Sequence, residues 1–130
     1  MRFCIVTIFC NRCYRVNAGG SNMKIIHCAD IHLDSKMSAN LTKEKARERK
    51  TELLTTFQNM VTYGAEQGVA AIIIAGDLFD TKNVSATARN VVKDLIQGHP
   101  KIAFYYLQGN HDEGSLRPVF RNFRRIFIYL

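Results

Sequence analysis

The sequence predicts a layered α/β domain with largely parallel strands that are joined by crossover helices. Two observations support this class. Segments of strand and helix character alternate from residue 24 onward in the order strand, helix, strand, helix, strand, which indicates parallel strands with right-handed connections. Residues 69–75 form an almost unbroken apolar run, which is typical of a strand buried on both faces.

The first strand is expected at residues 24–28 and the first helix at residues 43–66. Thr42 is a suitable cap for this helix, Glu44 lies in its first turn, and Gly68 ends the helical region. Apolar side chains recur there at steps of three and four residues, as in an amphipathic helix; they are Ala46, Leu53, Phe57, Met60 and Val61.

The second half of the chain repeats this alternation. A second helix is expected from Ser85, a candidate cap, to residue 97, and Gly98 and Pro100 stop it. Its apolar positions are Val91, Val92, Leu95 and Ile96. Residues 102–107 are expected to form a third strand, and residues 125–130 the start of a fourth.

Residues 1–22 differ from the rest of the chain. They contribute +3 of the formal charge of +7, so residues 23–130 carry +4. The apolar run at residues 3–10 resembles a signal peptide, but arginines follow it and no clear small-residue cleavage site appears. We interpret the segment as a leader or mis-called start that is poorly ordered, with the domain beginning at Met23.

Cysteine usage and composition are ordinary for a globular protein in a reducing cytoplasm. Cys10 and Cys13 form one C-x-x-C pair, which is a weak zinc or redox signal, whereas Cys28 fits a core strand. Basic residues gather at 43–50, but Glu44 and Glu48 interrupt them, so we interpret this stretch as a solvated helix face rather than a nucleic-acid patch. No apolar run approaches the roughly 18 residues of a membrane span.

Ligand-type residues follow each of the first three predicted strands. Because the carboxyl ends of parallel strands share one edge, which is where α/β folds bind ligands, these residues are expected to converge. Taken singly, an aspartate after a strand is more often a cap or turn residue, so the coincidence of all three runs favours a site. The runs contain Asp30 and His32; Gly76, Asp77 and Asp80; and Gly109, Asn110, His111 and Asp112.

Four of these residues form a plausible set of metal ligands. Asp30 and His32 are two positions apart, so in an extended chain their side chains point the same way. Asp77 can bridge two ions with its two oxygens, and Asn110 offers a neutral oxygen. The mixture of oxygen and nitrogen donors suits manganese, iron or zinc. Two ions about 3.5–4 Å apart can clamp the attacking and leaving oxygens of a phosphoryl transfer.

The remaining polar residues have other expected roles. His111 is the candidate catalyst, which can stabilise phosphate charge or protonate a leaving oxygen, and Asp112 can orient it. Gly76 and Gly109 fit sharp backbone turns.

Three polar residues near these runs are not expected to bind metal. Asp80 is expected to support a ligand or to cap a helix. His27 is expected to be a packed core residue, and His99 a loop histidine.

These runs resemble the first three motifs of the calcineurin-like metallophosphoesterase superfamily, over residues 23 to about 115. The amino-acid sequence of the first two runs is most similar to that of the SbcD-type DNA repair exonuclease branch. The resemblance implies that Asp30 and His32 bind the first metal, Asp77 bridges both and Asn110 binds the second. It makes His111 the catalytic histidine, supported by Asp112. It further implies two divalent ions, usually manganese, a DNA substrate, and an ATPase partner of the SMC-like kind.

The chain departs from the family pattern because the later histidine motifs are not present before Leu130. We therefore expect residues 23–130 to be a partial phosphoesterase domain, truncated at its C-terminus. The function expected is that of a metal-dependent nuclease component that hydrolyses phosphodiester bonds. The alternatives are a phosphatase or nucleotide phosphodiesterase of the same superfamily, or an inert fragment.

Overall fold

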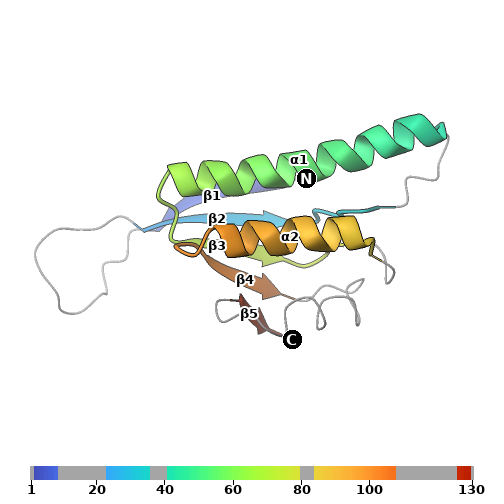
Figure 1. The fold of residues 1–130 in the computed structure, drawn as a ribbon. Coiled ribbons are helices and arrows are strands. Elements are labelled where there is room, and N and C mark those ends of the chain that lie inside the picture. The colour runs from blue at the N-terminus through green and yellow to red at the C-terminus, as the bar shows by residue number, and fades with distance from the viewer. Residues whose placement is uncertain (1, 9–22, 36–40, 80–83, 108–125, 130) are drawn as a thin grey trace, which may run out of the picture.

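A computed structural model describes residues 2–8, 23–35, 41–79, 84–107 and 126–129. Its strands form one five-stranded sheet in the order β1-β2-β3-β4-β5, with two helices in the connections (Figure 1). In chain order the elements are β1 (Arg2–Ile8), β2 (Met23–Ala29), α1 (Lys43–Glu66), β3 (Ala71–Ala75), α2 (Ala86–Gly98), β4 (Ala103–Leu107) and β5 (Ile126–Tyr129).

The four strands predicted from the sequence are present and parallel, since β2, β3, β4 and β5 pair in parallel with their neighbours. This arrangement confirms the predicted α/β class. Figure 1 shows that the N-terminal ends of α1 and α2 lie on the same side of the sheet as the carboxyl ends of the strands. No helix in the described ranges is both long and apolar enough to cross a membrane.

Strand β1 is a finding that the sequence did not predict. It pairs antiparallel with β2 along its whole length, from Arg2 opposite Ala29 to Ile8 opposite Met23. A short apolar run can take this place because the edge of β2 otherwise presents unpaired backbone groups. Residues 9–22, including Cys10 and Cys13, lie outside the described residues. The boundary at Met23 and the poor order of this segment therefore stay predictions.

Both helices begin where their sequences predict. The Thr42 side chain accepts the backbone N–H of Lys45 at 3.3 Å, and the Ser85 hydroxyl accepts that of Ala88 at 3.2 Å. Each contact satisfies one of the N–H groups that the first turn of a helix leaves without a partner. After α1, Gly68 adopts a left-handed φ of +65°, which glycine tolerates without strain.

The hydrophobic core lies on one face of the sheet. Ile26, Ile72 and Phe104 are in register across β2, β3 and β4 and are buried together with residues of both helices. Two crossovers of the same hand that step in the same direction place their helices on the same face. The core residues from the helices are Phe57, Met60, Val61, Ala88, Val92 and Ile96.

Two expectations about burial are wrong, and one is confirmed. Ile73 and Ala75 of β3 are only half-buried, so this strand is not buried on both faces within the described residues. His27 is exposed, because its neighbours Ile26 and Cys28 face the core and side chains alternate along a strand. Cys28 is fully buried, as expected of a core residue.

Candidate metal centre

The loops that follow β2 and β3 are joined by backbone hydrogen bonds. The N–H of His32 donates to the carbonyl of Asp77 at 2.9 Å, and the N–H of Leu33 donates to that of Leu78 at 2.8 Å. An isolated parallel bridge between Leu33 and Phe79 continues the pairing. The two loops therefore leave the sheet as a pair, and their side chains have a fixed relative position.

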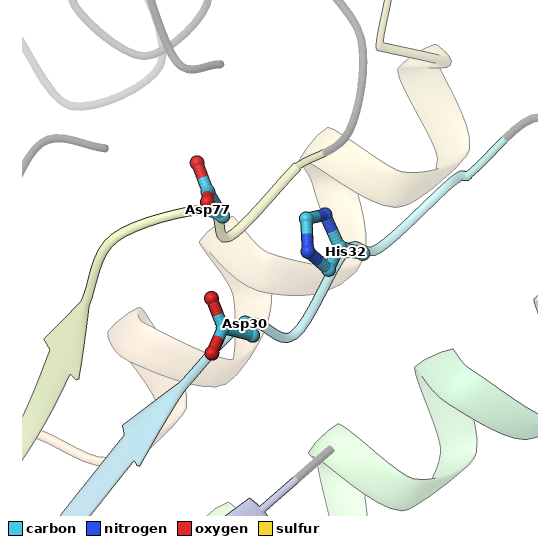
Figure 2. Close-up of side chains that lie close together, drawn as sticks. All are labelled: Asp30, His32 and Asp77. Carbon is cyan, nitrogen blue, oxygen red and sulfur yellow. The ribbon is translucent and has the colours of Figure 1, made fainter. Parts of the chain in front are cut away.

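The backbone of these loops is left-handed at several residues that are not glycine. The φ angles are 51° at Asp30, 51° at His32, 61° at Asp34 and 46° at Asp77. Aspartate and histidine adopt this region more often than most residues, but it remains uncommon and costs free energy. The expectation that Asp30 and His32 lie in extended chain is therefore wrong, although both side chains still point to one place (Figure 2).

Burial of the intervening side chains explains why the loops hold this conformation. Ile31, Leu33, Leu78 and Phe79 are each 1% exposed or less. They extend the core past the ends of the strands, and the alternating polar residues are left on the outer side. Sequestering these apolar groups provides the free energy that offsets the backbone strain.

Asp30, His32 and Asp77 come together at the carboxyl edge of the sheet. One donor atom from each lies within 4.8 Å of the others, and Figure 2 shows the three side chains converging from two loops. Asp30 is exposed, whereas His32 and Asp77 are half-buried, and the Nδ1 atom of His32 is buried. Asp30 and Asp77 therefore lie close together, as expected from the sequence, and their binding of an ion stays a prediction.

This set of donors fits a divalent cation. Bonds from carboxylate oxygen or imidazole nitrogen to zinc measure about 2.0–2.2 Å, so the ligand atoms around a tetrahedral ion lie about 3.4 Å apart. Donor atoms within 4.8 Å of one another can reach this separation by side-chain rotation. Two carboxylates and one imidazole suit manganese, iron or zinc, as the sequence indicated.

Other predicted site residues lie outside the described residues: Asp80, Gly109, Asn110, His111 and Asp112. Their roles stay predictions. One contact shows where the chain leading to Gly109 leaves the sheet: the N–H of Gly76 donates to the carbonyl of Leu107 at 2.9 Å. Gly76 has a φ of 73°, in agreement with its predicted turn. The end of β4, two residues before Gly109 in the sequence, thus lies directly beside the Asp77 loop.

The two remaining described histidines are not part of the cluster. His99 caps the C-terminal end of α2, and its Nδ1 atom lies 2.7 Å from the carbonyl oxygen of Leu95. This position, just before β4, is at the opposite edge of the sheet from Asp77 and agrees with the prediction of a loop residue. His27 is exposed within β2.

Sequence reasoning missed Asp34, whose carboxylate contacts Lys50 of α1 and the backbone N–H of Ser85. Burial would raise the pKa of Asp34, but the Ser85 N–H and the Lys50 ammonium outweigh that effect and hold the pKa below its usual value. The available signal was an aspartate two residues after His32. Its partners are 16 and 51 residues away, and no local pattern identifies them.

The sheet is parallel except at β1, and carboxylates and an imidazole gather at the carboxyl edge of β2 and β3. The sequence model of the calcineurin-like phosphoesterase family matches residues 23–130. The chain belongs to this family, whose members are metallophosphoesterases and hence hydrolases.

The chain is also similar in sequence to three curated relatives. The chain is 30% identical over 105 residues to the uncharacterized metallophosphoesterase YhaO of Bacillus subtilis, covering 76% of this chain and 26% of the relative. It is 31% identical over 93 residues to the DNA double-strand break repair protein Mre11 of Sulfolobus acidocaldarius, covering 69% and 22%. For the SbcD component of the nuclease SbcCD of Bacillus subtilis the identity is 29% over 93 residues, with the same coverage.

The chain spans about a quarter of the length of these relatives. Among solved structures, the fold is similar to that of the Pseudomonas putida nuclease MPE, with a TM-score of 0.54 and 19% sequence identity. This similarity covers 81% of the chain and 46% of the nuclease, and it supports the fold.

Proposed function

We propose that this protein is a manganese-dependent phosphodiesterase that cuts DNA as part of a nuclease. The observation that carries the proposal is the convergence of donor atoms from Asp30, His32 and Asp77 within 4.8 Å. Such a cluster, in a chain of the phosphoesterase family, is suited to bind divalent cations beside a phosphate group.

The residues have distinct roles in this proposal. Asp30 and His32 would hold the first ion, Asp77 would contribute to both ions, and Asn110 would hold the second. The ions would supply positive charge to the phosphate oxygens and hydroxide near neutral pH. His111 stabilises charge on the phosphate or protonates the leaving oxygen, and Asp112 orients the ring of His111.

Relatives support DNA as the substrate. Mre11 is named as a DNA double-strand break repair protein, and SbcD as one component of a nuclease. By analogy with these relatives, we propose that the protein works with an SMC-like ATPase partner. The formal charge of +7 is compatible with a polyanionic substrate. We place the protein in the cytoplasm, where such a repair nuclease would meet DNA.

The test is a cleavage assay on supercoiled plasmid and on end-labelled linear duplex with Mn²⁺. Plasmid nicking reports a single cut per molecule, which matters because we expect slow turnover. Asn110 is the only ligand assigned solely to the second ion, and affinity depends on the number of ligands. We expect Asp77→Asn and His111→Ala to abolish nicking. Asp94→Asn and His99→Ala change the same residue types away from the site and should leave it unchanged.

The outcomes separate the candidate functions. Manganese-dependent nicking that is lost only in the two site variants supports the nuclease. Nicking that persists in both of them would point to a contaminant and contradict the proposal. Faster hydrolysis of p-nitrophenyl phosphate than of bis-p-nitrophenyl phosphate would favour a phosphatase. Absence of manganese-dependent cleavage on every substrate would show that this chain is inert.

A further inference from the structure

Asp34 joins the loop that carries Asp30 and His32 to both helices. Its Oδ2 atom accepts the backbone N–H of Ser85 at 2.7 Å, and its Oδ1 atom accepts the ammonium of Lys50 at 3.2 Å. The side chain of Asp34 is only 14% exposed. One carboxylate therefore contacts the start of α2 and the N-terminal third of α1 from a position two residues after His32.

The contact with Ser85 fixes the loop against a well-defined point of α2. Ser85 is the N-cap of this helix, where its hydroxyl accepts the N–H of Ala88 and its carbonyl accepts the N–H of Arg89 at 3.1 Å. The N-terminus of a helix carries partial positive charge, which favours a carboxylate. Hydrogen bonds to an ionised acceptor are also about twice as strong as neutral ones.

Strain in the backbone explains why the loop needs such a contact. His32 and Asp34 are both left-handed, with φ angles of 51° and 61°. Backbone hydrogen bonds from the N–H groups of His32 and Leu33 hold the upstream side of this turn against the β3 loop. The Asp34 carboxylate holds the downstream side. Residues in strained conformations keep them only when the surrounding contacts over-determine them.

Asp34 does not belong to the ligand set itself. Among the described residues, the donor atoms that gather within 4.8 Å come from Asp30, His32 and Asp77. Both oxygens of Asp34 are instead engaged by Lys50 and Ser85. Any influence of Asp34 on the cluster is therefore transmitted through the turn that contains His32.

We propose that Asp34 is a positioning residue for the metal centre: by binding the Ser85 N–H and the Lys50 ammonium, it holds the turn that directs His32 toward Asp30 and Asp77. The inference rests on the proposed function, because it requires metal binding at this cluster. Groups that orient metal ligands typically change metal affinity by about 10–100-fold when they are removed. We expect Asp34→Ala to weaken Mn²⁺ binding within that range.

The experiment measures the dissociation constant of Mn²⁺ from the electron paramagnetic resonance signal of the free ion. Asp34→Asn keeps an oxygen for the Ser85 N–H and tolerates the left-handed backbone, so its affinity should lie between those of wild type and Asp34→Ala. Lys50→Gln should weaken binding less than Asp34→Ala, because the Ser85 contact remains.

Two matched controls remove neighbouring contacts without disturbing Asp34. Thr42→Ala loses the cap hydroxyl of α1, which accepts the N–H of Lys45. Arg49→Gln breaks the Arg49–Glu52 ion pair, in which the side chains are 63% and 61% exposed. Both controls should bind Mn²⁺ as tightly as wild type, although Thr42→Ala should unfold at a lower temperature.

Thermal unfolding in EDTA and in Mn²⁺ separates positioning from a purely structural role. A purely structural role lowers the melting temperature of Asp34→Ala equally in both conditions, whereas positioning also shrinks the increment that Mn²⁺ provides. If wild type binds Mn²⁺ and Asp34→Ala shows the same affinity and the same Mn²⁺-induced rise in melting temperature, this inference alone is overturned. Failure of wild type to bind Mn²⁺ would overturn the proposed function and this inference with it.

Discussion

Replacing Asp30 by asparagine should have opposite effects on stability in the absence and presence of metal. The donor atoms of Asp30 and Asp77 lie within 4.8 Å of each other, so two carboxylates face one another when no cation lies between them. Asparagine keeps the size of the side chain and tolerates the φ of 51° at this position. The substitution therefore removes a charge and leaves the local backbone as it is.

The magnitude without metal follows from Coulomb's law. Two unit charges 4.8 Å apart repel by about 0.9 kcal/mol at the dielectric constant of water. Salt reduces this value, because the Debye length is about 10 Å at 0.1 M ionic strength. In EDTA and low salt, Asp30→Asn should therefore unfold at a temperature about 3–4 °C above wild type, at about 4 °C per kcal/mol for a domain of this size.

The magnitude with metal follows from binding linkage. A cation present at about 100 times its dissociation constant stabilises the folded state by about 2.7 kcal/mol. If asparagine weakens binding about 100-fold, the remaining stabilisation is about 0.4 kcal/mol. The Mn²⁺-induced increase in melting temperature should fall from about 11 °C in wild type to about 2 °C in the variant.

The assay is differential scanning fluorimetry over a series of Mn²⁺ concentrations, with EDTA as the reference. His32→Gln should lose most of the increment as well. His27→Gln and Asp94→Asn replace an exposed histidine and an exposed aspartate elsewhere, and should keep the full increment. A wild-type increment that Asp30→Asn leaves intact would refute metal binding by Asp30. A variant less stable than wild type in EDTA would refute the repulsion between the carboxylates.

Three further predictions concern the fold. A Cβ at Gly64 would lie 2.9 Å from the buried Cδ1 of Ile26, whereas nothing lies within 4 Å of a Cβ at Gly98. Chemical denaturation should show Gly64→Ala less stable than wild type by about 1 kcal/mol and Gly98→Ala more stable by about 0.5 kcal/mol. Stability changes of the same sign in both variants would contradict the packing. Burial raises the pKa of the Cys28 thiol from 9.0 to about 12, so the unfolded chain ionises first as pH rises above 9. The free energy of unfolding should fall by about 1.4 kcal/mol between pH 8 and pH 10, a slope that Cys28→Ala should lack. Deleting residues 1–22 should change the melting temperature little, because β1 pairs with one neighbour only. A large drop in melting temperature would show that β1 contributes substantially to stability and would contradict this prediction.

Much of the fold was predictable because its determinants are local. The helix caps at Thr42 and Ser85 and the apolar run of β3 are each encoded within a few residues. The alternation of strands and helices then fixes the parallel sheet and brings Asp30 and Asp77 to one edge. The exposure of His27 could also have been derived, since it lies between two core residues of a strand.

Other features were not predictable because they depend on contacts between distant segments. Nothing within residues 1–22 indicates that Arg2–Ile8 pairs with β2, since an edge strand is selected by the edge that it covers. The left-handed backbone at Asp30 and His32 depends on hydrogen bonds to the β3 loop. The role of Asp34 depends on where the folded chain places Ser85.

In the described part of the domain, the unfavourable features are concentrated where a cation would bind. Four left-handed residues that are not glycine occur in the described parts of the two loops. Two of them, Asp30 and Asp77, carry carboxylates of like charge that lie close together. Buried apolar neighbours and the paired backbones offset the strain, but neither removes the repulsion between the carboxylates. A divalent cation would convert that repulsion into attraction to a shared charge. Metal binding should therefore stabilise these loops more than any other described segment, and hydrogen exchange of the His32 and Leu33 amides should slow most when Mn²⁺ is added.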